Sequence, residues 1–300
     1  FDPGDEIFDG RFRIDPQQLD DVAQALRAAN FNVTRVTAEE LRAENSFNAT
    51  QFDVLVMRGD SVPRDAISNV KNFASAGGVL IALAAQRPFL IAMERRGKKW
   101  DYSPAQPNFA WETQDVMQTL GMRYIYAPGL HDAGVRHTPT AIFKKYLPAA
   151  REVLGKQPSF WVVPEDGGEF YPLMRSRRGD GADVSPQIFI ARKGNARAVV
   201  SAQDLWVKGG KGWDLSTQTV VALARIAADL HSGTLKLTPA DRVQIPRDLS
   251  PPLPLSTREV RGEVNPENAK PVVRWGKFNG SGNELPAAKS GQTTLPRSMK

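Results

Sequence analysis

The chain has 300 residues, an apolar fraction of 41% and a formal net charge of +6. This length allows one large domain or two smaller ones, and the apolar fraction is ample for a sizeable core. The absence of cysteine excludes disulfides, thiolate metal sites and cysteine nucleophiles. No run approaches the roughly 18 apolar residues of a membrane helix, so we predict no membrane span. The compartment stays open, with a secreted or periplasmic location favoured.

The positive charge is concentrated near the carboxyl terminus. Residues Thr234–Lys300 carry 11 basic and 6 acidic residues, a net charge of +5, and the rest of the chain is close to neutral at +1. Nucleic-acid-binding surfaces interleave basic and aromatic side chains on one face. This tail has scattered charges and only two aromatic residues, Trp275 and Phe278. We therefore predict no nucleic-acid partner.

The first predicted elements are two helices and the strand between them. Asp15–Ala29 has a cap at Asp15, a proline at the first helical position and apolar residues at helical spacing. Phe31–Val36 is typical of a strand, and Thr37–Arg42 begins with the spacing of a capping box. Doubly wound sheets usually begin with a strand that feeds their first helix. We therefore expect the first strand of the sheet to lie just upstream of Phe1.

A strand–helix–strand unit follows. Val54–Met57 and Val79–Leu83 are continuous apolar runs, which suit strands that are buried on both faces of a parallel sheet. The segment between them has apolar residues at helical spacing and ends at the Gly77–Gly78 pair. Two strands joined by a helix within about thirty residues form the βαβ unit. The sequence therefore predicts that both strands lie in one sheet.

The rest of the domain is predicted to alternate between short strands and helices. We expect Pro88–Ala110 to be an insertion with little regular structure and Arg175–Ser185 to be a loop. The predicted helices are Trp111–Leu120, Ala141–Leu154 and Ser216–Leu230, and the predicted strands are Met122–Tyr126, Phe160–Val163, Phe170–Met174, Ile188–Arg192 and Ala196–Ala202.

The amino-acid composition changes after Gly233. Nine prolines fall in the last 67 residues, and large apolar residues become rare. We predict an α/β domain over residues 1–233 and a proline-rich basic arm, or the start of a following β domain, over residues 234–300. An arm of this composition is ordered only where it lies on another surface. Its predicted partner-binding anchors are Val272, Val273, Trp275 and Phe278.

Polar residues follow three of the predicted parallel strands. Ligands bind beyond the carboxyl ends of the strands in open α/β sheets, so these residues are the candidate ligand-binding site. An acidic group beside an indole ring could hold a sugar. The candidates are Arg58, Asp60, Gln86, Arg87, Gln203, Asp204 and Trp206.

Two further motifs carry no predicted site. His131 and His137, with Asp132 between them, match no defined zinc spacing. The glycines of Gly209–Gly212 lack the spacing and the Lys-Ser/Thr pair of a phosphate-binding loop. We predict no metal, no cofactor and no catalytic residue.

Three segments together resemble the class I glutamine amidotransferase-like superfamily, which has a flavodoxin-like α/β fold. They are Phe52–Gly59, Val70–Leu83 and Ala196–Asp204, and the resemblance covers roughly residues 1–233. It implies three layers around a mainly parallel sheet. Enzymes of this superfamily carry a cysteine on the elbow after the strand equivalent to Val79–Leu83. This elbow instead reads Ala82-Leu-Ala-Ala-Gln86.

The segment after the predicted strand Ala196–Ala202 also departs from the enzymes of the superfamily. Enzymes of the superfamily complete their triad there with a histidine and a glutamate, whereas this chain has Gln203 and Asp204. The resemblance therefore implies a non-catalytic module that supports assembly or substrate presentation in a larger carbohydrate-active or hydrolytic bacterial protein. Its partners would be other domains of that polypeptide or further copies of the chain. The alternative is a sugar-binding protein or hydrolase that uses the polar strand ends.

Overall fold

The computed structural model describes residues 1–3, 16–97, 99–101, 114–126, 134–156, 160–179, 181–202, 216–243 and 245. All of them belong to one compact unit, Phe1–Leu255. The predicted partner-binding residues lie outside the described residues, and they remain predictions. These are Val272, Val273, Trp275 and Phe278.

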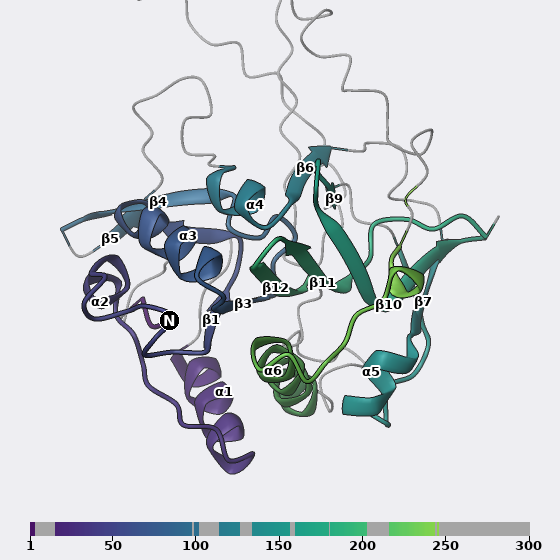
Figure 1. Cartoon of the computed structure of the whole chain (residues 1–300), viewed down its shortest axis with the longest axis horizontal. Helices are drawn as coiled ribbons and strands as arrows, with labels where there is room; N and C mark the ends of the chain where they lie inside the picture. The colour runs from purple at the N-terminus through teal and green to yellow at the C-terminus, as the bar shows by residue number, and fades with distance from the viewer. Residues whose placement is uncertain are drawn as a thin grey trace, which may run out of the picture. The chain divides into compact units, whose positions relative to one another are not determined.

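A seven-stranded mixed sheet forms the centre of this unit (Figure 1). Its strands lie in the order β1 (Val54–Arg58), β3 (Val79–Leu83), β12 (Ala196–Ser201), β11 (Ile188–Lys193), β10 (Glu169–Arg178), β7 (Gly134–Pro139) and β8 (Val153–Lys156). The pairs β1–β3 and β3–β12 are parallel, and the four remaining pairs are antiparallel. Most strands of this sheet therefore run in one direction, but parallel pairing within it is confined to β1, β3 and β12.

The predicted βαβ unit is confirmed. Val54 pairs with Val79 and Arg58 with Leu83, and helix α3 (Ile67–Ser75) connects the two strands. Gly77 has φ +101°, a left-handed conformation that favours glycine. At Gly78 an added Cβ would lie 2.3 Å from the ring of Phe73. The glycine pair therefore lets the helix end and pack directly against the sheet.

Helices cover both faces of the sheet, as expected for three layers. Helices α2 (Ala38–Arg42), α3 and α4 (Asp115–Thr119) contribute to one apolar core. Helices α1 (Pro16–Ala28), α5 (Ala141–Tyr146) and α6 (Ser216–His231) contribute to the core on the opposite face (Figure 1). Strand β3 is buried along its whole length because alternate side chains enter the two cores.

Two smaller sheets complete the described structure. One contains β2 (Ser61–Pro63), β4 (Ile91–Arg96) and β5 (Lys99–Asp101), and the other contains β6 (Met122–Tyr126) and β9 (Phe160–Pro164). The expectation of little regular structure in Pro88–Ala110 is therefore wrong for β4 and β5. Two short 3₁₀ helices cover Arg64–Ala66 and Pro239–Asp241.

Three further expectations need correction. Phe31–Val36 is not a strand, because it forms no ladder with any strand that the structure describes. Helix α5 ends at Tyr146 rather than Leu154, since Pro148 offers no backbone N–H to continue it. Strand β10 extends through Arg178 into the predicted loop, because it pairs with β7 as far as that residue.

The start of the predicted arm lies on the α/β core. The amide of Val243 donates to the carbonyl of Phe170 at 2.9 Å, and the Val243 side chain is buried. Leu235 and Leu237 pack against the core that contains α6. The boundary at residue 233 stays a prediction about the chain's organisation. Among the described residues, no helix is long and apolar enough to cross a membrane.

Candidate functional site

The loops after β1 and β3 bring two candidate residues together. The Asp60 and Arg87 residues are 1% and 5% exposed. The Arg87 amide donates to Asp60 Oδ1 at 2.7 Å, and Arg87 Nε donates to Oδ2 at 3.2 Å. The Asp60 carbonyl also accepts from the Ile91 amide at 3.0 Å. This geometry is that of a buried structural ion pair, which ties the two loops together.

The other candidates are placed differently. Gln86 is half-buried in the loop after β3, and Arg58 is half-buried at the end of β1. Arg58 lines a cavity beside β1, whereas Asp60 and Arg87 do not. The remaining candidates lie outside the described residues and remain predictions: Gln203, Asp204 and Trp206.

The elbow after β3 holds a strained residue. Ala84 has φ +54° and is buried, and the amide of the next residue, Ala85, donates to the carbonyl of Ser201 on β12 at 3.0 Å. A non-glycine residue in this conformation costs roughly 1–3 kcal/mol and persists only where its surroundings enforce it. Such strain is common at active sites, but the side chain here is a methyl group. It can neither attack an electrophile nor transfer a proton.

His137 belongs to the core and not to a reactive site. Its Nδ1 lies 2.8 Å from Ser176 Oγ, and the two residues are 2% and 1% exposed. Burial lowers the pKa of His137 to about 4, so the imidazole is neutral at physiological pH. Strand β8 packs closely here, since a Cβ added at Gly155 would lie 3.0 Å from His137 Nε2. This packing leaves no room for a substrate at the pair.

No candidate metal site is found in the part of the chain that the structure describes. No group of three or more histidine, cysteine, aspartate or glutamate side chains is close enough there to hold an ion. His131 and Asp132 lie outside the described residues.

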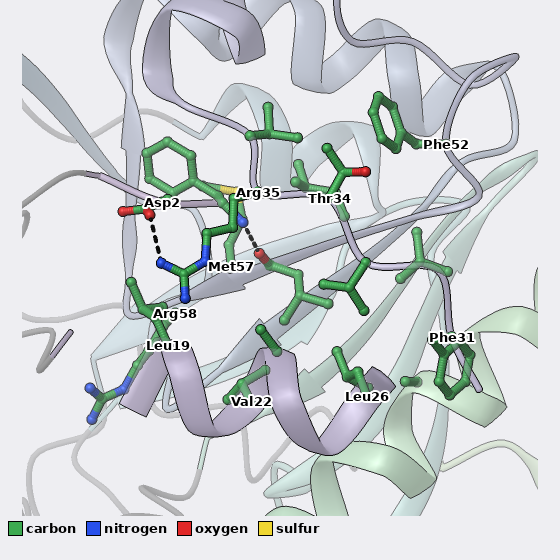
Figure 2. A pocket seen from close by; sticks show the side chains of 18 of the residues that line it. Asp2, Leu19, Val22, Leu26, Phe31, Thr34, Arg35, Phe52, Met57 and Arg58 are labelled. Carbon is green, nitrogen blue, oxygen red and sulfur yellow. Dashed lines mark hydrogen bonds and ion pairs between the residues drawn. The ribbon is translucent and has the colours of Figure 1, made fainter. Parts of the chain in front are cut away.

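Of the predicted ligand-binding residues that the structure describes, Arg58 alone lines a cavity beside β1. This cavity of about 150 Å³ lies between the outer edge of β1 and the segment Phe31–Val36 (Figure 2). Helix α1 contributes Leu19, Val22 and Leu26 to its wall.

The polar groups of the cavity gather around the first two residues. The α-amino group of Phe1 donates to the carbonyl of Val56 at 2.8 Å. Burial is the main cause that lowers the pKa of this amine to about 6. The carboxylate of Asp2 lies 3.4 Å from a guanidinium nitrogen of Arg35 (Figure 2). Arg35 also pairs with Asp20. The cavity therefore has an apolar body and a charged rim.

Comparison with known proteins gives a coarse fold relation. No protein-family model matches the chain, and no curated protein matches it. An exo-beta-1,4-mannosidase from Opitutaceae bacterium strain TAV5 aligns over 72% of this chain with 17% identity and a TM-score of 0.44. The chain spans 31% of the length of that mannosidase.

A second solved structure is similar over a comparable part of the chain. It is a protein from Thermoplasma acidophilum that is described as a component of GMP synthase. The alignment covers 76% of this chain and 96% of that one, with 9% identity and a TM-score of 0.41. Both similarities are distant and concern the arrangement of the α/β elements.

Proposed function

We propose that this chain is a non-catalytic, amidotransferase-like α/β module that supports assembly or substrate presentation in a larger carbohydrate-active or hydrolytic protein. The observation that carries the proposal is the elbow after β3. The strained residue there is Ala84, and the loop has only alanine side chains before Gln86. A nucleophile needs a reactive atom and a base within hydrogen-bond reach, and this elbow supplies neither.

The buried ion pair supports the same proposal. Asp60 and Arg87 are hydrogen-bonded to each other at the strand ends where a ligand would otherwise be bound. A buried charged pair of this kind is destabilised when one partner is removed, so a ligand could recruit either group only at a large energetic cost. The carbohydrate-active or hydrolytic context rests on the sequence resemblance.

The experiment is an assay of the full chain against a panel of glycosides, oligosaccharides and esters. We expect no turnover above a buffer control. Matched variants are Asp204→Ala, at the candidate strand end, and Asp166→Ala, in a turn that contributes to no candidate site. Turnover that Asp204→Ala abolishes and Asp166→Ala preserves would refute the proposal in favour of an enzyme that uses the polar strand ends.

Sugar binding without turnover is a separate outcome. Calorimetric titration of the same oligosaccharides would detect it. Binding that is lost in Trp206→Ala would favour the sugar-binding alternative, because an indole ring supplies the stacking surface for a sugar face. Absence of binding in the parent chain leaves assembly as the supported role.

A further inference from the structure

Strand β8 forms one edge of the central sheet, next to β7 and at the opposite end of the strand order from β1 (Figure 1). Among the described residues, two large apolar side chains are exposed, and both belong to this strand. They are Val153, which is 46% exposed, and Leu154, which is 73% exposed. Edge strands are usually protected by charged residues, proline or a covering element, because their open backbone groups can pair with another strand. Strand β8 instead has a leucine near the middle of its edge.

The hydrogen bonds of β7 show which backbone groups of β8 face outward. The Thr140 amide, directly after β7, donates to the Leu173 carbonyl on β10 at 2.9 Å. Alternate residues of an antiparallel strand direct their backbone groups to opposite neighbours, so the odd-numbered residues of β7 face β8. His137 is the register partner of Val153. The backbone groups of Val153 therefore face β7, and those of Leu154 face outward.

The side chain of Leu154 lies on the exposed face of the sheet. Leu154 is directly opposite Arg136 in the β7–β8 register, and the side chains of such a pair share one face. Arg136 forms an ion pair with Glu152, and Glu152 Oε2 also accepts from Thr138 Oγ1 at 3.0 Å. These charges compensate each other, so the surface around Leu154 does not repel an apolar strand.

A second copy of β8 has the sequence to pair with this edge. Outward-facing residues must meet outward-facing residues, so even-numbered residues of the two antiparallel copies pair with each other. One such register places Leu154 opposite Leu154 of the second copy. By two-fold symmetry it also places Glu152, directly before β8, opposite Lys156 of the other copy on both sides of the axis. A shift by two residues would put the leucine opposite a charged residue. The self-paired register therefore joins apolar to apolar and opposite charge to opposite charge.

We propose that two copies of the chain pair through β8, antiparallel and about a two-fold axis at Leu154, so that their central sheets join into one. Each Leu154 amide then donates to the Leu154 carbonyl of the other copy. A contact of this kind uses the same surface on both copies, so it closes as a dimer and forms no filament. The inference rests on the proposed assembly role and names its surface and partner. Its test measures mass, so it can fail while the absence of turnover stands, and the reverse.

Sedimentation equilibrium of the full chain tests the dimer. A short edge pairing belongs to the small, transient interfaces, so the measurement covers protein concentrations up to about 100 μM. The mass of the parent should rise with concentration toward twice the 33.0 kDa of the single chain. Leu154→Arg should weaken dimerisation by about tenfold or more, because it removes the apolar contact and places two like charges at the axis.

A pair of charge reversals tests the register. Glu152→Lys and Lys156→Glu each place like charges opposite each other in a self-pair, so each variant alone should be monomeric at the same concentrations. An equimolar mixture of the two should recover the dimer, because each copy then meets opposite charges. The matched control is Lys71→Glu on α3, which changes the charge as much as Lys156→Glu and should dimerise as the parent does.

Three results would overturn the proposal. The first is a parent that stays monomeric, because another segment of the chain or a different protein would then have to cover Leu154. The second is a dimer that Leu154→Arg leaves intact. The third is a mixture of the two charge-reversal variants that stays monomeric. Recovery of the dimer in the mixture would also show that both variants keep the fold.

Discussion

Removal of the Asp60 carboxylate tests whether the strand ends are structural. The side chains of Asp60 and Arg87 are 1% and 6% exposed, so the loss of one charge leaves the other buried. Breaking one partner of a buried pair costs about 3–5 kcal/mol. In Asp60→Asn a carboxamide replaces the carboxylate, so an NH₂ group, which can only donate, takes the place of one of the two oxygens that accept from the amide and the Nε of Arg87.

This loss translates into a measurable melting shift. A change of 1 kcal/mol moves the melting temperature of a domain of this size by about 2–4 °C, so Asp60→Asn should lower it by about 6–20 °C. The matched control is Glu39→Gln, which removes a 3.2 Å surface pair with Arg95. The side chains of that pair are 59% and 45% exposed, and its loss should change stability by less than about 1 kcal/mol.

A double-mutant cycle identifies the partner. Arg87→Met should also destabilise the fold, because it leaves the Asp60 carboxylate buried without the guanidinium group that pairs with it. The double variant should cost about 2–3 kcal/mol less than the sum of the single variants, since the pair is lost only once. Urea unfolding of the four proteins measures this coupling. Single variants as mild as Glu39→Gln, or strictly additive effects, would refute the structural role and favour both residues as ligand-binding candidates.

Three further predictions concern other parts of the fold. Burial lowers the pKa of His137 from 6.5 to about 4, so the unfolded chain takes up a proton that the folded chain resists. The free energy of unfolding should therefore be unaffected by His137 above pH 6.5 and should fall by about 3 kcal/mol as the pH falls to 4. Urea titrations of His137→Gln should lack this pH dependence. Gly78→Ala should cost about 1–3 kcal/mol by chemical denaturation because its Cβ would meet a phenyl ring at 2.3 Å, and an unchanged midpoint would contradict the close packing. Truncation after Gly233 should lower the melting temperature by roughly 5 °C relative to truncation after Ile245, because it removes the buried Val243; equal melting would place the boundary at residue 233.

The parallel part of the fold was predictable because its signal is local. Val79–Leu83 is continuously apolar, and a strand with that pattern must be covered on both faces. The antiparallel part was less visible. Arg175 and Arg177 are typical of a loop, yet both pair with Asp183, and β7 supplies the backbone partners of this stretch. Only the pairing, which a single segment cannot show, makes this polar run a strand.

Phe31–Val36 shows a second limit of local patterns. Its residues favour a strand, but a ladder needs a neighbour at strand spacing. The described structure has the cavity there instead. The sequence correctly placed Asp60 and Arg87 at strand ends, but it could not show that two residues in different loops face each other. Their role as ligand-binding residues stays a prediction, and their mutual hydrogen bonds favour a structural role.

An activity assay of the full chain tests the central claim most directly, namely the proposal that this chain is a non-catalytic module. The elbow after β3 holds Ala84 and Ala85, and neither side chain can act as a nucleophile or a base. We expect no turnover of glycosides, oligosaccharides or esters above a buffer control. Turnover that Asp204→Ala abolishes and Asp166→Ala preserves would contradict the claim.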